Sequence, residues 1–314
     1  MPLLYDYDHA IMIVRPRPGT LGLLYILRGS VVPRIAPRVL AISAMAALVA
    51  WGAQVRPAWM PAFPAAPFTL MGVALSIFIG FRNNACYDRW WEARKQWGAL
   101  VTEMRAFARL SVTTLPDEDT RQRVLRRTIA FAHCLAGRLR GEATLEALRP
   151  WLLEAEWRAL QGRRNEPSVI LREIGADLTR EMREGRISDI IYQLFDTRLT
   201  AMVGVQAACE RIQGTPLPFA YTLLLHRTAY LVCLLLPFGL VGSLGLITPL
   251  VTAVLAYAFF GLDALGDEIE EPFGMMENDL PLNALVRVIE IDVLEALDEP
   301  VLPQALRPER FVLT

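Results

Sequence analysis

The chain has 314 residues, of which 54% are hydrophobic and 21% charged, and its mean hydropathy is +0.32. This combination is too apolar for an ordinary soluble protein and too charged for a protein made only of membrane spans, and it excludes disorder. The net charge of −1 excludes the overall basic footprint of a nucleic-acid-binding protein. The four cysteines form no CxxC pair, so neither a zinc knuckle nor a disulfide framework is predicted, and they are interpreted as small apolar residues.

The first two apolar runs lie near the N-terminus. Residues 39–53 contain no charge, and the run continues to Arg56, which gives about 17 residues, the lower limit for a spanning helix. The second run, Phe68–Phe81, has 14 residues. As a helix it reaches about 21 Å, which is short of the ~30 Å hydrocarbon core of a bilayer. Three preceding residues could add an interfacial start: Trp59, Met60 and Phe63.

The other two apolar runs lie near the C-terminus. Phe219–Leu240 is long enough to span a bilayer but carries His226 and Arg227 near its middle. The fourth run is Leu246–Leu262. We expect the turn between these runs to be formed by three glycines: Gly239, Gly242 and Gly245.

Basic residues predict the topology of these spans. Five arginines precede the first run, at positions 15, 17, 28, 34 and 38, which does not fit a cleavable signal peptide. Cations that flank a span are retained on the cytoplasmic side, so both termini are predicted to be cytoplasmic. The predicted segments are 1–38, cytosolic; 39–81, transmembrane helices 1 and 2; 82–216, a cytosolic helical region; 217–262, transmembrane helices 3 and 4; and 263–314, cytosolic.

The middle of the chain has the pattern of amphipathic helices. Apolar residues return at spacings of three and four among arginines and glutamates, and no segment shows strand alternation. The predicted helices cover 89–110, 121–139, 146–160, 169–184 and 187–212, and breaks are expected at Pro116, Asp117, Gly162 and Pro167. The predicted fold is an all-α multi-pass membrane protein whose membrane half and cytosolic half share continuous helices.

The second apolar run has two helical faces of different character. Three bulky residues recur at i, i+4 and i+8, namely Val73, Ile77 and Phe81, and three small ones lie on an adjacent face, namely Gly72, Ser76 and Gly80. In one interpretation the small face packs on neighbouring helices and the bulky face lines a pore that gates by dewetting. The alternative is a lipid-facing stripe beside a packing face, and the pattern alone favours this alternative.

Several motifs occur in a fixed order along the chain. Asp88-Arg89-Trp90-Trp91-Glu92 begins seven residues after Phe81 and is followed by Trp97-Gly98. The other motifs are Leu27-Arg28-Gly29-Ser30, Gly185-Arg186-Ile187-Ser188-Asp189-Ile190-Ile191, Pro218-Phe219-Ala220-Tyr221-Thr222, Glu271-Pro272-Phe273-Gly274 and Asn278-Asp279-Leu280-Pro281-Leu282. Together they resemble the bestrophin family in its bacterial form, over about residues 24–297.

This resemblance implies an ion channel in the bacterial inner membrane, built as a homopentamer around one central pore. Val73, Ile77 and Phe81 from five chains would form the apolar rings of its neck, and protein would shield the short helix from lipid. The residue that matches the family's cytosolic constriction is Ile191, which pattern alone assigns to a helix core. The implied partners are the lipid bilayer and small monovalent ions, with no cofactor and no metal.

The chain departs from calcium-activated bestrophins after its Pro272-Phe273-Gly274 motif. Those relatives continue with an unbroken acidic run, because Ca²⁺ takes six to eight oxygen ligands. Here Met275-Met276-Glu277-Asn278-Asp279 follows, so two methionines replace potential ligands. Only Glu277, Asn278 and Asp279 and backbone carbonyls remain, and we predict no high-affinity Ca²⁺ site.

The sequence leaves the charge of the permeant ion open between anions such as chloride and cations such as sodium or potassium. The Phe81 ring edge and Arg82 would favour anions if both faced the pore, but Arg82 could instead pair with an acid on a neighbouring helix. An acidic cluster could concentrate cations, although a solvated helix face is the simpler interpretation. It consists of Asp263, Asp267, Glu268, Glu270 and Glu271.

Ionisable and aromatic residues of the spans have two interpretations each. His226 and Arg227 could form a proton or anion site, but a structural pair, for example with Asp263, is favoured. Trp90 and Trp91 could stack on Arg89 or Arg94 at a subunit contact, but membrane-surface anchoring is more common.

Other classes of function fit the sequence less well. The histidines are His9, His133 and His226, none at metal-ligand spacing, and no HExxH, Walker or Gly-rich motif is present, so no enzyme is predicted. A secondary transporter would be expected to show repeat symmetry, which is not visible. A membrane-anchored scaffold or sensor is the remaining alternative to a channel.

Overall fold

A computed structural model describes residues 12–13, 19, 22, 25–56, 63–143, 145–309 and 311–313. The chain divides into two compact units. We call residues 16–90 and 216–271 the span unit, and residues 1–15, 91–215 and 272–314 the charged unit. Helix α3 (Ala65–Thr114) is continuous and contributes residues to both units. The expected Trp59, Met60 and His9, and the arginines at positions 15 and 17, lie outside the described residues.

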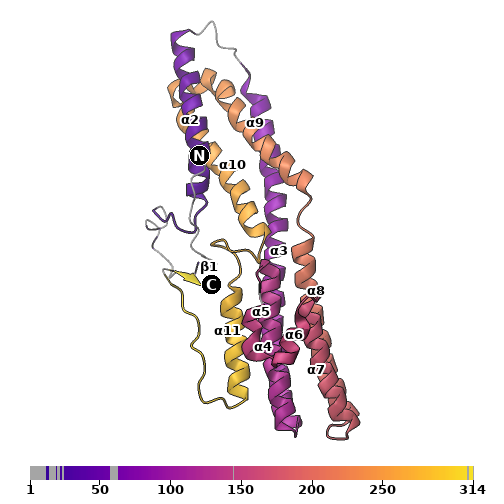
Figure 1. The fold of residues 1–314 in the computed structure, drawn as a ribbon. Coiled ribbons are helices and arrows are strands. Elements are labelled where there is room, and N and C mark those ends of the chain that lie inside the picture. Colours follow the sequence, from indigo (N-terminus) through magenta and orange to yellow (C-terminus); the bar gives the residue numbers. More distant parts are fainter. Residues whose placement is uncertain are drawn as a thin grey trace. The chain divides into compact units, whose positions relative to one another are not determined.

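The span unit is built from long apolar helices (Figure 1). Besides the first part of α3 it contains α2 (Val32–Val55), α9 (Phe219–Leu244), the short 3-10 helix η3 (Gly245–Ile247) and α10 (Thr248–Glu270). Among the described residues, three helical stretches are long and apolar enough to cross a membrane: 32–55, 66–114 and 219–270. The last of these comprises α9 and α10, which η3 separates.

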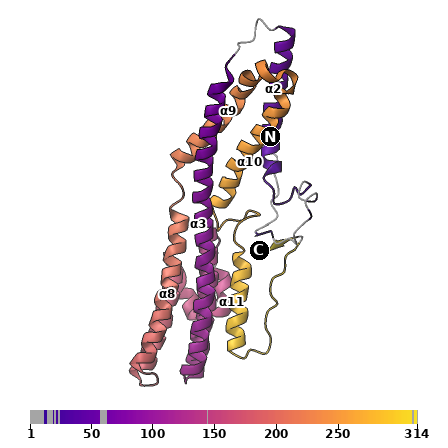
Figure 2. The ribbon, with the colours of Figure 1, turned by 180° about the vertical axis from the view of Figure 1, so that it is seen from behind.

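The core of the span unit lies where α2, α3, α9 and α10 meet. Helix α2 runs beside α10 along most of its length, and α9 contacts both (Figures 1 and 2). The buried apolar side chains come from all four helices, and they are Ile35, Ile42, Leu75, Ile79, Leu225, Ala229, Val232, Cys233, Ala256, Phe259, Phe260 and Ala264. Since each helix has apolar side chains on most of its surface, the unit buries only part of its apolar residues within one chain.

The charged unit is centred on α4 (Glu118–Arg140), which packs against α7 (Glu166–Arg183), α8 (Asp189–Gly214) and α11 (Leu282–Ala296). The shorter elements are α5 (Leu145–Leu148), η2 (Arg149–Trp151), α6 (Glu154–Leu160), β1 (Met12–Ile13) and β2 (Val312–Leu313). The two short strands pair antiparallel, with Met12 opposite Leu313. Apart from this pair, the described residues fit the predicted all-α class.

Local capping explains the ends of these helices. Asp117 accepts a hydrogen bond from the Thr120 backbone N–H at 2.9 Å and so caps α4, and hydrogen bonds from Thr120 lower the pKa of its carboxyl. Gly141 ends α4 with φ +71°, a conformation that favours glycine. Asn165 and Ser188 cap α7 and α8 in the same way as Asp117 caps α4.

The predicted helices at 121–139, 169–184 and 187–212 are confirmed by α4, α7 and α8. All four cysteines are buried and free, as expected of small apolar residues, and burial raises the pKa of Cys209 to about 12. The second apolar run and the expected helix 89–110 belong to one helix, α3, because no glycine, proline or cap interrupts residues 81–89. The helix that contains the first apolar run begins at Val32, with a proline in its first turn, which is a favourable position for proline.

Three other expectations are corrected. The predicted helix 146–160 is divided into α5, η2 and α6, because Pro150 interrupts it. Helix α11 was not predicted at all. Gly239 and Gly242 are helical, so Gly245, with φ +53°, is the glycine that forms the turn between α9 and α10.

The role of Gly239 is close packing. A Cβ atom there would lie 2.3 Å from Cδ2 of Phe68 on α3, whereas a Cβ at Gly242 would meet no atom within 4 Å. We predict that Gly239→Ala destabilises the protein by about 1–3 kcal/mol through overpacking, whereas Gly242→Ala is neutral or slightly stabilising because alanine favours helix. Thermal unfolding of the purified protein in detergent tests this. Equal melting temperatures of the two variants would contradict it.

Candidate functional site

One face of the first half of α3 carries bulky apolar side chains that the described part of the chain leaves largely exposed. Val73, Ile77 and Phe81 are 54%, 51% and 62% exposed. They lie at i, i+4 and i+8, as the sequence predicted, and so share one side of the helix. Leu70, which is 71% exposed, extends the same side. The chain therefore presents an apolar stripe. Such a stripe is expected to contact another protein chain or lipid, or to line an apolar passage.

The opposite face of α3 is held in the core. Leu75, Ile79, Arg82 and Cys86 are each no more than 2% exposed. The expected packing face of small residues is not the buried one within a chain, since Ser76 and Gly80 are exposed. The buried face of α3 carries larger apolar side chains instead, because these fill the space between α3 and the helices α9 and α10.

Arg82 is the buried cation of this face. Its Nη1 donates to Asp263 Oδ1 at 3.0 Å and to the Asp263 carbonyl oxygen at 3.2 Å. Its Nη2 donates to Asp267 Oδ1 at 2.6 Å and to Glu270 Oε2 at 3.1 Å. The three acids lie at i, i+4 and i+7 of α10, so they share one face of that helix. We call Arg82, Asp263, Asp267 and Glu270 the Arg82 cluster.

The Arg82 cluster settles two alternatives left open by the sequence. Arg82 is 1% exposed in the single chain and pairs with acids of a neighbouring helix. The acidic run of α10 is not simply a solvated face, since Asp263 is 2% exposed and Asp267 and Glu270 also bind Arg82. A buried guanidinium requires such partners because an unpaired charge is costly to bury.

Two further groups complete the surroundings of the Arg82 cluster. His226 Nδ1 lies 2.7 Å from Asp263 Oδ2, which is the structural pair that the sequence favoured. Arg34 of α2 reaches Asp267 Oδ2 at 3.3 Å. The cluster therefore joins α2, α3, α9 and α10 through polar contacts. Arg227, in contrast, is exposed and forms no ion pair with the described residues.

The approach of α10 to α3 beside the Arg82 cluster depends on Gly266. A Cβ there would lie 2.6 Å from Asn83 Oδ1 and 3.1 Å from Arg82 Nη1. Asn83 Nδ2 donates to the Leu262 carbonyl oxygen at 3.0 Å. No pattern in the sequence singled out Gly266 or Asn83, because their roles depend on which helices become neighbours.

The residues of the Asp88-Arg89-Trp90-Trp91 motif have different surroundings. Arg89 Nε donates to the Glu270 carbonyl oxygen at 2.6 Å, at the C-terminal end of α10. Trp90 stacks on Tyr87 with ring centroids 6.3 Å apart, and the Arg94 guanidinium lies 5.7 Å from the Trp91 ring. Asp88 is exposed. The arginine–tryptophan contact therefore occurs within the chain, and Arg89 serves as a cap of α10.

The loop after α10 is closed by its own groups. Pro272 and Phe273 are buried and Gly274 half-buried, and the Pro272 carbonyl accepts a hydrogen bond from the Leu280 N–H at 2.9 Å. Asp279 Oδ2 accepts a hydrogen bond from the Met276 N–H at 2.7 Å.

Glu277 and Asn278, the other residues of this loop with side-chain oxygens that could bind Ca²⁺, contact β1. The Glu277 carbonyl accepts a hydrogen bond from the Ile13 N–H at 3.1 Å, and Asn278 forms a bridge with Met12. Glu277 and Asn278 thus hold the loop to the N-terminal strand through their backbones. Among the described residues, no group of three or more His, Cys, Asp or Glu is placed to hold a metal ion.

A cation of the chain lies near this loop. Arg140, the last residue of α4, donates through Nη1 to Asn283 Oδ1 at 2.7 Å. Burial lowers the pKa of Arg140, and the negative charges of Glu142 and Asp279 oppose that effect. The carboxylate of Asp279 thus has a guanidinium in its surroundings. Arg140 was not predicted to lie here, because no spacing rule connects it with residue 279.

The start of α8 carries the residue matched to a second constriction. Ile191 is half-buried, and its backbone N–H donates to the capping Ser188 Oγ at 3.3 Å. Its neighbour Ile190 is 68% exposed. Both isoleucines therefore have side-chain surface that is not covered within the charged unit.

Comparisons with known proteins agree with these features. A family model described as Bacterial/Fungal Bestrophin protein matches residues 12–295. A protein of Mesorhizobium japonicum named as a voltage-dependent anion channel-forming protein is 47% identical over 300 residues, which are 96% of each chain. The Escherichia coli K12 protein YneE, named in the same way, is 41% identical over 303 residues, 95% of this chain and 98% of its own.

Solved structures show the same relationship. A bacterial bestrophin homologue from Klebsiella pneumoniae is 37% identical, with a TM-score of 0.82 over 85% of this chain and 100% of that one. The fold is therefore shared with a bacterial bestrophin homologue, and three helical stretches of the described residues are long and apolar enough to cross a membrane. This chain belongs to the bacterial and fungal bestrophin family, and its function is that of an ion channel, not an enzyme.

Proposed function

We propose that the chain forms a homopentameric channel in the bacterial inner membrane, with four spans, α2, α3, α9 and α10, and with both termini in the cytoplasm. Small monovalent ions pass through a central pore whose neck is lined by α3. The similarity to relatives named channel-forming proteins supports this proposal. The main supporting observation is the exposed stripe of Val73, Ile77 and Phe81, which lies on a helix whose opposite face is buried in the core.

An apolar stripe of this kind suits the narrow part of a pore. Five copies of Val73, Ile77 and Phe81 give stacked rings that contain no hydrogen-bonding groups, and such constrictions gate by dewetting. The Arg82 cluster fixes the opposite face of the same helix, so the orientation of the stripe follows from the core of one chain. Burial of the short apolar run within an assembly also removes the mismatch with bilayer thickness.

Arg227 supports the presence of neighbouring copies. It lies near the middle of α9, is exposed in the single chain and has no ion-pair partner among the described residues. An arginine that faces lipid at this depth costs several kcal/mol, so such residues face protein or water. A partner on an adjacent subunit, or a water-filled cavity, meets this requirement.

The neck as proposed carries no fixed charge. Arg82 follows Phe81 in sequence, but its guanidinium points into the core, and its acidic partners are on the same side. Two properties of the neck can still affect which ions pass: the cost of removing water from the ion and the positive edge of the Phe81 ring. The ring edge favours anions. The names of the relatives also favour anions.

We further propose that Ca²⁺ does not activate this channel, and that Ile191 forms a second, cytosolic constriction. Asp279 already accepts a backbone hydrogen bond, and Arg140 supplies positive charge in its surroundings. Two methionines stand where further carboxylates would be needed. For the second constriction, the exposed surface of Ile190 and Ile191 at the start of α8 is the supporting observation.

The neck is tested by single-channel recording in planar bilayers. We expect the triple variant Val73→Ala, Ile77→Ala, Phe81→Ala to give larger or more persistent unitary currents than the unchanged protein. The smaller alanine side chains leave a wider opening, and a wider opening dewets less readily. Phe78→Ala is the matched control, since Phe78 is also 51% exposed but lies off this stripe. Its currents should equal those of the unchanged protein.

Two outcomes would contradict the proposal. An intact oligomer that passes no current would favour a scaffold or transporter. Identical currents in the triple variant and the unchanged protein would place the neck elsewhere. The reversal potential in a KCl gradient, measured in the same recordings, gives the sign of the permeant ion. In the triple variant any anion preference should weaken, because the variant removes the Phe81 ring edges that favour anions.

The anchoring role of Arg82 is tested by stability. Arg82→Gln leaves buried carboxylates without their cation, and we expect a loss of about 3–5 kcal/mol. Arg34→Gln removes an arginine that also contacts Asp267 but is 41% exposed, and it should cost at most about 1 kcal/mol. Thermal unfolding of both variants in the same detergent measures the difference. Similar melting temperatures would show that the Arg82 cluster does not hold α3.

Calcium independence is tested by isothermal titration calorimetry on the purified protein. We expect no saturable heat at micromolar Ca²⁺, because too few oxygen ligands are free around Asp279. Single-channel recordings should also be unchanged when a chelator replaces micromolar Ca²⁺. Binding with a micromolar dissociation constant would contradict this prediction.

A further inference from the structure

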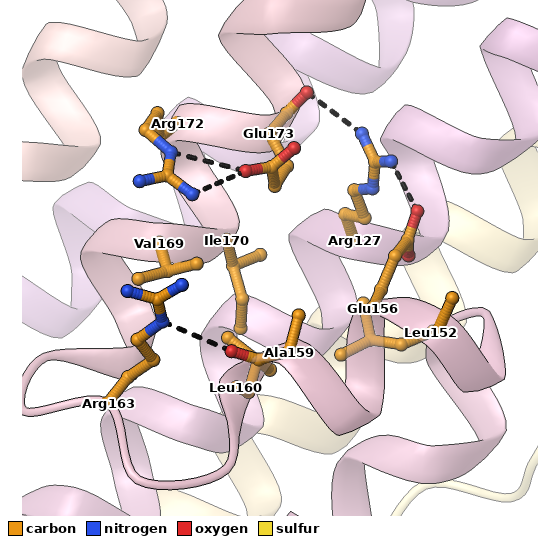
Figure 3. A pocket seen from close by; sticks show the side chains of 11 residues that line it. Arg127, Leu152, Glu156, Ala159, Leu160, Arg163, Val169, Ile170, Arg172 and Glu173 are labelled. Atoms are coloured by element: carbon orange, nitrogen blue, oxygen red, sulfur yellow. Dashed lines mark hydrogen bonds and ion pairs between the residues drawn. The ribbon is translucent and has the colours of Figure 1, made fainter.

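The charged unit contains a cavity of about 230 Å³ that the channel function does not use. It lies between α4, α6 and α7, and Figure 3 shows the side chains around it. The floor and walls are apolar, formed by Leu152, Ala155, Ala159, Leu160, Val169 and Ile170. An apolar cavity with a few polar groups at one side is the usual form of a small-molecule site.

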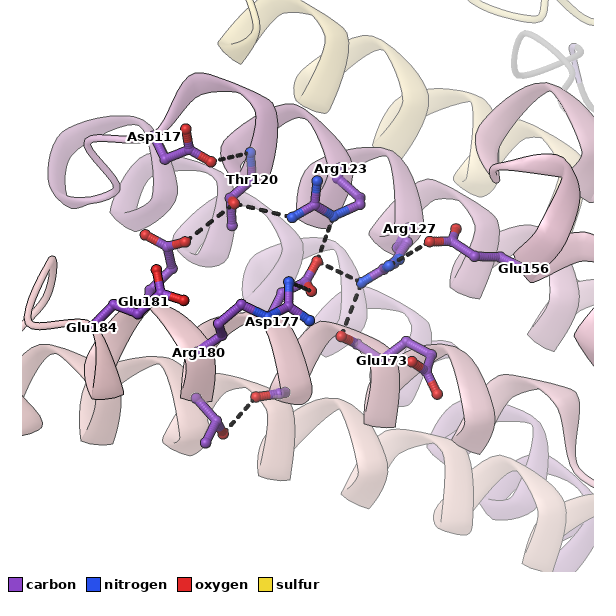
Figure 4. A network of polar contacts seen from close by, with 12 residues as sticks. Asp117, Thr120, Arg123, Arg127, Glu156, Glu173, Asp177, Arg180, Glu181 and Glu184 are labelled. Carbon is purple, nitrogen blue, oxygen red and sulfur yellow. Dashed lines mark hydrogen bonds and ion pairs between the residues drawn. The ribbon is translucent and has the colours of Figure 1, made fainter.

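The polar side of the cavity begins with Arg127, which is 5% exposed. Arg127 belongs to a network between α4 and α7 (Figure 4). Its Nη1 donates to Asp177 Oδ2 and to the Glu173 carbonyl oxygen, both at 2.9 Å, and its Nη2 donates to Glu156. Its Nε is buried and has no hydrogen-bond partner in the described part of the chain. This N–H is enclosed by protein atoms, so a ligand in the cavity does not reach it.

Two more arginines lie at the cavity, as Figure 3 shows. Arg163 comes from the loop between α6 and α7, donates to the Ala159 carbonyl oxygen at 3.2 Å, and has no carboxylate partner among the described residues. Arg172 is paired with Glu173 at 2.7 Å, on the exposed side of α7. Of the three lining arginines, Arg127 and Arg172 are paired with carboxylates, so Arg163 is the lining arginine left to recognise an anion.

We propose that this cavity binds a small amphipathic carboxylate. Its apolar part would lie on the α6 and α7 side chains, and its carboxylate would accept hydrogen bonds from Arg163. The volume of 230 Å³ is below the roughly 300–1,000 Å³ of pockets for drug-sized ligands. A short aliphatic chain or one aromatic ring therefore fits, and a long fatty acyl chain does not.

Isothermal titration calorimetry of the full-length protein with hexanoate and benzoate tests the proposal. We expect saturable binding of these acids and no comparable binding of the neutral amides hexanamide and benzamide, because Arg163 recognises the charge. Dodecanoate, tested below its micelle concentration, should not bind more tightly than hexanoate at this site, because the cavity does not hold the longer chain.

Variants locate the binding. Arg163→Gln should weaken hexanoate binding by at least about tenfold, since charge-assisted hydrogen bonds are lost. Ala159→Phe keeps every charge but fills the cavity, and it should abolish binding. Arg158→Gln is the matched control. Like Arg163, Arg158 is exposed, but it lies on α6, pairs with Glu154 and does not line the cavity. It should bind as the unchanged protein does.

Three results would overturn the proposal: no saturable binding of either acid, equal binding of acids and amides, or unchanged binding in Ala159→Phe. Circular dichroism and thermal unfolding of Ala159→Phe show whether a loss of binding reflects a loss of fold. If that variant unfolds, the comparison of Arg163→Gln with Arg158→Gln tests the proposal. Both arginines are exposed, and both substitutions remove one positive charge. None of these results depends on the neck, so the channel proposal stands or falls separately.

Discussion

The contact between Arg82 and the acidic face of α10 determines how the span unit is built. A guanidinium that is 1% exposed must be paired, and its carboxylates come from one face of one helix, so α3 has a single acceptable rotation about its axis. His226 on α9 and Arg34 on α2 join the same acids. Four helices that share an apolar surface, and could otherwise slide, are thereby held in register.

This constraint connects the core to the proposed pore. Apolar packing alone is non-directional, and α3 has bulky apolar residues on nearly every side of its first turns. Because Arg82, Leu75 and Ile79 face inward, Val73, Ile77 and Phe81 must face outward. The absence of charge in the proposed neck has the same cause, since the arginine next to Phe81 is withdrawn into the protein.

The charged unit shows how arginine supports helix packing away from the apolar spans. Helix α4 is buried along much of its length although it contains many arginines, and acids of α6 and α7 satisfy Arg123 and Arg127. Figure 4 shows that these contacts form a continuous network. The planar guanidinium suits this role, because several acceptors can surround it in one plane. The cavity beside Arg127 lies at the edge of this network, where apolar side chains of α6 and α7 replace the acids.

The sequence by itself determined the apolar runs, the helical class, the stripe of Val73, Ile77 and Phe81, and the order of the motifs that resemble bestrophins. These features are periodic or local, and local spacing is what a sequence displays directly. It also showed the acids of α10 and named Asp263 as a partner of His226, but could not choose between a pore-facing and a paired Arg82. That choice, the need for glycine at 239 and 266 and the presence of α11 were decided by tertiary structure. Each depends on which distant segments become neighbours, because burial and pairing are properties of contacts rather than of spacing.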